Sequence, residues 1–470
     1  MSARSGLALR LATLPLAALM AYAVARGAAA PTAEDGFEEA GLVIVLGGLA
    51  AAAIAAPPAW AVSGALALSL FQSHWDLLGP SFSVDRYALI VVIASVLARE
   101  WRHRDGRLQT RPVDWMLIVV ATYAITSAWV VGELADRDAR FELIDKLGLI
   151  PFALFFVAPL AFRTEADRRV LLGTLVAIGA YLGVTAIIET TGPEALVVPH
   201  YITDPAEGIH LDRARGPFLD AGANGIALYM CGVAAVVAFV KWRGRRWRIV
   251  ALLVAGLCML GVLLALTRIV WLAAIVASPI ALAAARETRR YLIPAVGAAV
   301  AIVMLAVAVI PGLQGRVNTR RNDNSETLWA RRNSNAAAVR MVEARPLVGF
   351  GWGRFAEDST PYYRQSQDYP LTFLHDLHNV YLANAVELGL VGLFLWLAAL
   401  AGAVGGAILR RGPPELRAWK LGLVAVAMGL LISWLTAPAE YVLPTLLMWL
   451  WAGVAWGARE PEPGPAAPAL

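Results

Sequence analysis

Apolar segments of roughly 18–22 residues recur along the chain, and short polar stretches separate them. One helix needs about 20 apolar residues to cross the hydrocarbon core of a bilayer. The pattern predicts twelve to fourteen transmembrane helices, because two segments beside Pro57 and Pro58 are short and rich in small residues. The segments lie at residues 7–25, 40–56, 58–73, 85–98, 113–131, 144–162, 170–189, 222–240, 249–265, 269–285, 291–311, 380–408, 418–436 and 440–458.

The composition agrees with this pattern. Of 470 residues, 59% are hydrophobic and 16% are charged, and the mean hydropathy is +0.62. Soluble domains average about 45–50% apolar and about 25% charged residues. We therefore expect an all-α polytopic membrane protein with a retained first helix rather than a cleaved signal peptide. Cys231 and Cys258 lie inside apolar segments and are interpreted as small core residues.

Basic clusters occur in alternate loops and predict the orientation. Short loops rich in Lys and Arg stay on the cytoplasmic side. Every cluster follows an even-numbered segment, so both termini are expected on the cytoplasmic side. The clusters are Arg99–Arg111, Arg163–Arg169, Lys241–Arg248, Arg286–Arg290 and Arg410–Arg417, whereas the acidic stretch 33–42 and the mixed stretch Glu133–Glu142 fall in the other set of loops.

Two long polar stretches, 190–221 and 312–379, then face the extracytoplasmic side. The second contains nine arginines, but loops longer than about 60 residues escape the charge rule, and we expect short helices within it. The predicted division is N-terminal transmembrane helices at 1–189, a first extracytoplasmic loop at 190–221, central helices at 222–311, a large loop at 312–379, C-terminal helices at 380–458 and a disordered tail at 459–470.

Arginines stand at two places where the predicted loops meet the membrane. Arg213 and Arg215 precede Gly216-Pro217, and Asn224 opens the next helix. Guanidinium groups bind phosphate oxygens in a bidentate way, although arginines at headgroup level are an alternative. Arg268 stands alone in a very short turn, where a charge is costly unless it faces a cavity or extends to the interface.

The large loop contains a helical pattern followed by a glycine turn. The first part of the stretch 325–355 predicts an amphipathic helix, which could lie on the membrane surface or over a cavity and which ends at Arg345-Pro346. Three glycines then predict a tight turn rather than a nucleotide-binding loop, since no strand precedes them. The residues at helical spacing are Leu328, Trp329, Arg332, Val339 and Val342, and the glycines are Gly349, Gly351 and Gly353.

Polar residues crowd the point where the large loop returns to the membrane, at His375, Asp376, His378 and Asn379. A zinc site would need His200 or His210 as well, and a histidine paired with headgroups or backbone is a second reading. The third reading is a neutral imidazole that acts as a general base. Asn379 fits a helix N-cap or a group that orients the ring. We expect no metal.

These motifs together resemble the O-antigen ligase and polymerase superfamily of bacterial envelopes. The residues that carry the resemblance are RGPF at 215–218 with Asn224, TR at 267–268, PLVGFGWGRF at 346–355, and HNVYL at 378–382 with ELGLVGL at 387–393. The similarity covers roughly residues 80–458 in hydropathy, and its motifs fall within 213–230, 264–271 and 325–393. Thr267 stands where many relatives have serine, and His375 and Asp376 are not part of the shared pattern.

The resemblance implies transfer of a glycan from undecaprenyl pyrophosphate to an acceptor hydroxyl on the periplasmic face, without a metal or cofactor. Ligases use the lipid A core as acceptor, whereas polymerases use another lipid-linked repeat unit. By position, Arg215, Arg268 and His378 match the two arginines and the histidine of the family. We assign Arg213, Asn224, Arg345 and Asn379 to substrate binding. The expected partners are the donor, the glycan acceptor and membrane lipid, and not nucleic acid.

The chemistry suits these residue types. Fixed guanidinium groups in a site of low dielectric stabilise the charge that builds on a leaving pyrophosphate. That leaving group needs no proton, so no pair of carboxylic acids is required. The acceptor hydroxyl does need to lose a proton, which His378 can accept, and inversion at the sugar carbon follows.

Two other classes of protein remain as alternatives. A transporter usually places binding groups near the midplane on broken helices and often shows inverted repeats. The hydropathy shows no repeat, and the unusual charges here lie at the membrane boundary. If the protein were an assembly factor, the position of the charged Arg268 in a short turn between two membrane segments would have no explanation.

Overall fold

The computed structural model describes residues 47–457, except 49, 73, 79–82, 104–109, 311, 323–324, 365–376 and 438–440. The predicted segment 7–25, the acidic stretch 33–42, and the predicted tail 459–470 lie outside the described residues. So do His375 and Asp376 of the polar stretch before α17.

The described residues form helices and connecting turns, and they contain no strand. The helices are α3 (Pro58–Leu68), α4 (Val84–His103), α5 (Pro112–Val131), α6 (Arg137–Glu142), α7 (Leu149–Ala161), α8 (Glu165–Thr191), α9 (Ala221–Lys241), α10 (Arg245–Leu264), α11 (Arg268–Ala283), α12 (Arg286–Arg289), α13 (Leu292–Val309), α14 (Leu313–Asn322), α15 (Ser325–Ala344), α16 (Phe355–Asp358), α17 (Val380–Leu400), α18 (Gly406–Leu409), α19 (Arg417–Ser433) and α20 (Val442–Trp456). Each segment predicted from residue 58 onward overlaps one of them.

Many of these helices have the length and composition of membrane spans. Within the described residues, eight helical stretches are long and apolar enough to cross a bilayer, and three shorter ones are apolar as well. The eight are Pro112–Val131, Arg137–Ala161, Glu165–Thr191, Ala221–Lys241, Arg245–Leu264, Leu292–Val309, Val380–Leu409 and Pro414–Ser433. The predicted fold class, an all-α polytopic membrane protein, is confirmed. The count of twelve to fourteen stays a prediction, since it includes segments outside the described residues.

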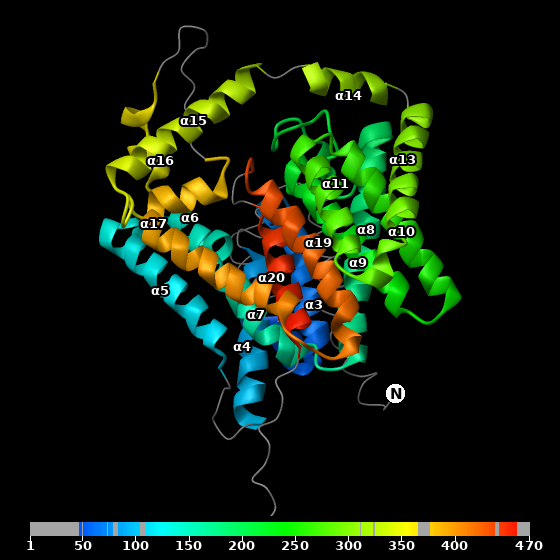
Figure 1. Cartoon of the computed structure of the whole chain (residues 1–470), viewed down its shortest axis with the longest axis horizontal. Helices are drawn as coiled ribbons and strands as arrows, with labels where there is room; N and C mark the ends of the chain where they lie inside the picture. The colour runs from blue at the N-terminus through cyan, green and yellow to red at the C-terminus, as the bar shows by residue number, and fades with distance from the viewer. Residues whose placement is uncertain are drawn as a thin grey trace, which may run out of the picture.

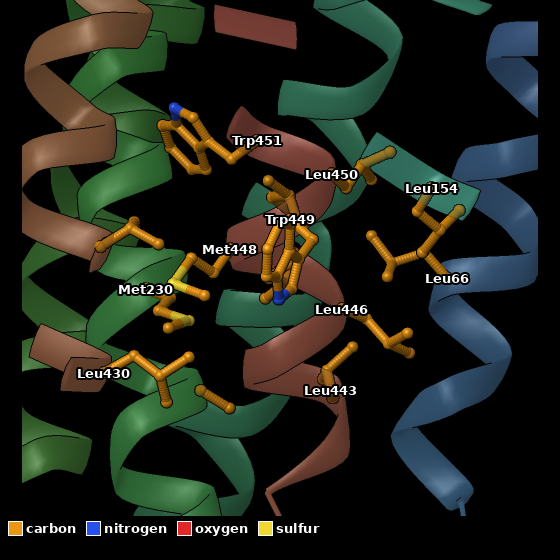
Figure 2. Packing of buried hydrophobic residues seen from close by; sticks show 14 of the residues in the cluster. Leu66, Leu154, Met230, Leu430, Leu443, Leu446, Met448, Trp449, Leu450 and Trp451 are labelled. Carbon is orange, nitrogen blue, oxygen red and sulfur yellow. The ribbon is translucent and has the colours of Figure 1, made fainter. Parts of the chain in front are cut away.

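The core of the bundle lies around α9 and α20 (Figure 1). Figure 2 shows Leu446 and Leu450 on the side of α20 that faces Leu66 and Leu154, and Met448 on the side that faces Met230. Small residues let these helices approach closely, as is common in membrane bundles. A Cβ added at Gly453 of α20, for example, would lie 2.6 Å from the backbone oxygen of Phe155 in α7.

Loops that were predicted on the cytoplasmic side contact one another. Lys241 Nζ lies 3.1 Å from Glu165 Oε2, and Arg417 Nη2 lies 2.6 Å from Glu287 Oε2. We call this end of the bundle the basic end, formed by the loops around residues 163–169, 241–248, 286–290 and 410–417. The two cysteines are buried and free, as expected for core residues.

Loops of the other set contact one another in the same way. Arg354 of the large loop forms an ion pair of 3.1 Å with Glu133, and the Trp352 indole N–H donates to the Ala139 oxygen over 3.2 Å. The loop end is therefore formed by residues 133–142, 200–218 and the described part of 312–379. The contacts agree with the predicted alternation of the loops, while the side of the membrane that each end faces stays a prediction.

The large loop crosses the loop end of the bundle. In Figure 1, α14 and α15 run along this end from α13 to α16. Helix α15 ends before Arg345, as predicted. Of the residues at helical spacing, Arg332 is exposed and Val339 is 45% exposed. Small residues form the buried face instead and allow close packing: Ala330, Ser334, Ala337 and Ala338, with Asn333 and Met341.

The predicted glycine turn is confirmed, and it docks on α17. Gly349, Gly351 and Gly353 all have positive φ. The amide of Gly351 donates to the Glu387 oxygen over 2.9 Å, and a Cβ at Gly349 would overlap with the backbone of α17. Helix α17 is kinked at Gly389, where the turn crosses it.

Candidate functional site

The first polar loop is joined directly to the turn that carries Arg268. The backbone N–H of Ala214 donates to the Leu264 oxygen over 3.1 Å, and Asn224 Nδ2 donates to the Ala214 oxygen over 2.9 Å. Leu264 is the last residue of α10, and Arg268 is the first residue of α11. The structure therefore places the Arg213–Arg215 stretch beside the Arg268 turn, although the whole of α9 and α10 lies between them in sequence.

Arg215 is fully buried and its guanidinium is bound to protein oxygens. Nε donates to the Ile202 oxygen over 2.9 Å, and Nη2 donates to the Asp204 oxygen over 2.7 Å. Nη1 donates to the Glu207 oxygen. Burial lowers the pKa of this guanidinium, and the nearby Glu189 carboxylate opposes the shift. In this arrangement Arg215 holds the loop 202–207 against the bundle.

Arg268 has a different environment. It is exposed at the start of α11, in a turn of three residues after α10. Within the described part of the chain, its guanidinium has no hydrogen-bond or ion-pair partner. The hydroxyl of Thr267 donates to the Ala265 oxygen over 2.9 Å and so helps to shape this turn.

A further arginine, Arg331 of α15, is near enough to Arg268 for the two charges to interact. Burial lowers the pKa of the half-buried Arg331 guanidinium; Tyr441 raises it, the positive charge of Arg268 lowers it further, and Asp220 raises it. These four side chains come from four separate elements: the N-cap of α9, the start of α11, α15 and the residue before α20. We call Asp220, Arg268, Arg331 and Tyr441 the arginine cluster.

Asp220 and Tyr441 meet at one glycine in the first turn of α9. Asp220 caps this helix, because Oδ1 accepts the amide of Ala223 over 2.6 Å, while Oδ2 lies 3.6 Å from His210 Nδ1. A Cβ added at Gly222 would overlap with the Tyr441 hydroxyl and would lie 3.1 Å from Asp220 Oδ1. The absence of a side chain at Gly222 thus lets the hydroxyl approach the carboxylate.

His378 lies half-buried just before α17, and its neighbours fix the position of its backbone. Asn379 Oδ1 accepts the amide of Leu382 over 3.0 Å, which confirms the predicted N-cap. Leu377 packs in one cluster with Ala338 of α15. Since Ala338 is about two turns, roughly 10 Å, from Arg331 along α15, this helix connects the His378 segment with the arginine cluster.

The remaining predicted residues have structural contacts. Arg213 Nε lies 3.5 Å from the neighbouring Asp212 Oδ1. The Arg345 guanidinium is exposed and lies 4.6 Å from the centre of the Phe350 ring. Asn224 is buried and holds Ala214. The described residues include no group of three or more side chains of the kinds that ligate metals.

The sequence pattern did not identify Arg331, Asp220 or Tyr441. The pair Arg331-Arg332 was visible in the predicted helix, but one residue of a helix corresponds to a rotation of about 100°, so the choice depends on the buried face. Asp220 could have been found as a helix N-cap, because it precedes an apolar segment with the spacing of a capping residue.

Comparison with known families finds a match for the segment that contains Arg268, Arg331 and His378. Residues 253–397 match the family model described as O-antigen ligase. The matched segment includes Arg268, Arg331 and His378, whereas Arg215 precedes it. No curated protein matches the chain. The match confirms the resemblance to the O-antigen ligase superfamily, and it supports a ligase or polymerase type of function in general.

Proposed function

We propose that the protein is a glycosyltransferase of the O-antigen ligase type. It transfers a glycan from undecaprenyl pyrophosphate to an acceptor hydroxyl, with the lipid A core oligosaccharide as the acceptor, at the periplasmic face of the inner membrane. The family match over residues 253–397 supports the reaction class. The observation that carries the proposal is Arg268, an exposed arginine at the loop end whose guanidinium has no protein partner within the described residues.

A diphosphate suits this place for electrostatic reasons. Arg268 lies close enough to Arg331 for its charge to oppose protonation of that residue. Bringing two guanidinium groups together is costly unless an anion lies between them, and phosphate oxygens match the fork of donors on each group. The same groups would stabilise the growing negative charge as the bond to the carrier breaks.

His378 is the proposed general base. The acceptor oxygen attacks the anomeric carbon, the carbon–oxygen bond to the pyrophosphate breaks on the opposite face, and the configuration inverts. The imidazole accepts the hydroxyl proton and later releases it to water, a contribution of typically 10²–10⁴-fold. The pyrophosphate leaves as an anion with its electron pair, and no metal or cofactor takes part in the proposed step.

The other predicted residues receive roles according to their contacts. Arg215 is a positioning residue, because its donors hold the loop 202–207. Asn224 and Asn379 position the Arg268 turn and the His378 segment through their hydrogen bonds. Arg213 and Arg345 remain candidates for contact with the glycan.

The test is transfer in proteoliposomes that contain the purified protein, lipid-linked glycan and lipid A core. The proposal predicts a product without an ion gradient, which separates the enzyme from a transporter. A polymerase of the same superfamily is the alternative function. In cells without the gene, single lipid-linked repeat units would accumulate if the protein is a polymerase, and unligated lipid-linked polymer would accumulate if it is a ligase.

A further inference from the structure

Helix α17 is broken near its start. Gly389 has φ 68° and ψ 179°, values far from those of a helix. The apolar stretch continues to Leu409, so residues 390–409 already provide the roughly 20 residues that one helix needs to cross the hydrocarbon core. Residues 380–388, which directly follow His378 and Asn379, therefore form a separate short helix at the loop end. We call residues 380–388 the half-helix.

The break removes the hydrogen bonds that would join backbone groups on its two sides. Segment 346–351, at the start of the glycine turn, supplies the missing partners in both directions. The hydrogen bonds join Leu390 to Pro346 (2.7 Å), Val391 to Leu347 (3.3 Å), Phe350 to Val386 (2.8 Å) and Gly351 to Glu387 (2.9 Å), with the amide donor first in each pair. The large loop thus completes the broken helix at the membrane boundary, where unpaired backbone groups are costly.

The two backbones approach so closely that each needs a glycine at the crossing. A Cβ added at Gly389 would lie 2.2 Å from the Leu347 oxygen, and one added at Gly349 would lie 2.4 Å from the Val386 oxygen. Both glycines have positive φ, which residues with a side chain rarely adopt. The segment and the break therefore fit together in one arrangement.

Helix α5 holds this crossing from the side, where it lies along α17 (Figure 1). The Tyr123 hydroxyl donates to the oxygen of Leu388, the last residue before the break, over 3.0 Å. About one turn further along α5, Ser127 Oγ accepts the amide of Trp352 in the glycine turn over 3.2 Å. Two polar side chains on an apolar helix thus bind the break and the turn that completes it.

The far end of the half-helix carries His378. Leu377 packs in one cluster with Phe350, which belongs to the segment at the break. The amide of Val380 donates to the Trp434 oxygen over 3.0 Å. Because His378 and the break are about 15 Å apart along the helix, a tilt of roughly 4° at the break moves the start of the half-helix by about 1 Å.

We propose that Tyr123 is a positioning residue of the transferase. Through the Leu388 oxygen it fixes the direction of the half-helix, and thereby the distance between the His378 imidazole and the acceptor hydroxyl. Segment 346–351 is the other half of this clamp. The inference rests on the proposed function and deepens it, since it names what holds the general base in place. A misplacement of about 1 Å at a reacting group can lower the rate about 10²-fold.

The experiment measures steady-state transfer by the full-length protein in proteoliposomes, with lipid-linked glycan and acceptor varied in turn. Tyr123→Phe removes one hydroxyl and should lower kcat about tenfold, while KM for the lipid-linked glycan changes less than about twofold. Ser127→Ala should lower kcat in the same way but less. The matched control is Tyr291→Phe, because this tyrosine is exposed at the basic end and its hydroxyl accepts from Arg290. Its kcat and KM should equal those of the wild type.

A double-mutant cycle with His378→Ala shows whether Tyr123 acts through the histidine. If it does, Tyr123→Phe should lower the residual activity of His378→Ala by less than about twofold. A further tenfold loss in that background, or a wild-type kcat of Tyr123→Phe alone, would overturn the inference. If Tyr123→Phe does not fold, Ser127→Ala decides the question in the same cycle. Full activity of His378→Ala would instead overturn the general base of the proposed function.

Discussion

Glu189 accepts the backbone amides of Arg215 and Gly216, with distances of 3.0 and 3.1 Å to its two carboxylate oxygens. The turn that precedes α9 is therefore held from two directions. The carboxylate at the end of α8 holds its backbone, and the Arg215 guanidinium ties it to the loop 202–207. The sequence analysis assigns Arg215 and Arg268 to the same role, but their surroundings in the structure differ.

This difference predicts different effects of two alanine substitutions on stability. Arg215→Ala should lower the free energy of unfolding by about 3 kcal/mol or more, because it removes several hydrogen bonds to a buried charged group. Arg268→Ala should leave it almost unchanged, since that side chain is exposed. Both should reduce transfer, and thermal unfolding in detergent together with activity in proteoliposomes provides the measurement. An inactive Arg215→Ala protein of normal stability would contradict the positioning role.

The contrast between Arg215 and Arg268 also marks the limit of the sequence analysis. Both residues stand beside short turns at predicted membrane boundaries, so local patterns assign them the same chemistry. The carbonyl oxygens that accept hydrogen bonds from the Arg215 guanidinium belong to a loop that tertiary packing brings back against the turn. Hydropathy does not encode that approach, because it depends on the path of an irregular loop.

Other features were predictable because they depend on local physics. The lengths of the apolar segments determine where helices form, and Asn379 caps α17 because its side chain can satisfy an otherwise unpaired amide. The glycine turn follows from positive φ at Gly349 and Gly351. The buried face of α15 was not predictable from large apolar residues, because the helix packs through Ala and Ser.

His378 provides the second prediction. His378→Ala should reduce the turnover number by about 10²–10⁴-fold, with a much smaller change in donor binding, because the residue acts on the acceptor proton. Single-turnover transfer with saturating donor and acceptor measures this effect. His200→Ala is a matched control, since His200 is an exposed histidine in the first loop of the same end. A His378→Ala protein that turns over at the wild-type rate would remove the general base from the mechanism.

The orientation of the bundle gives a third prediction. Arg332 lies at the loop end and Arg246 at the basic end, and both side chains are exposed. A membrane-impermeant thiol reagent added to intact spheroplasts should label Arg332→Cys and should label Arg246→Cys only after lysis. The native Cys231 and Cys258 are buried, so their background should be small. Labelling of Arg246→Cys before lysis would reverse the predicted topology.

The last prediction concerns the contact between Gly222 and Tyr441. Gly222→Ala would place a methyl group inside the position of the Tyr441 hydroxyl, and overpacking of this kind typically costs about 1–3 kcal/mol. We expect lower thermal stability and weaker transfer, because the displaced tyrosine borders Asp220 in the arginine cluster. Gly256→Ala serves as the control, since a Cβ there meets nothing within 4 Å.

A second substitution separates the overlap from a general defect of α9. Tyr441→Phe removes the oxygen that the new methyl group would meet, so it should restore most of the stability lost in Gly222→Ala. A double-mutant cycle on thermal unfolding measures this coupling. If the changes in unfolding free energy of the two single variants simply add in the double variant, the hydroxyl does not lie against Gly222. Tyr441 would then not belong to the arginine cluster.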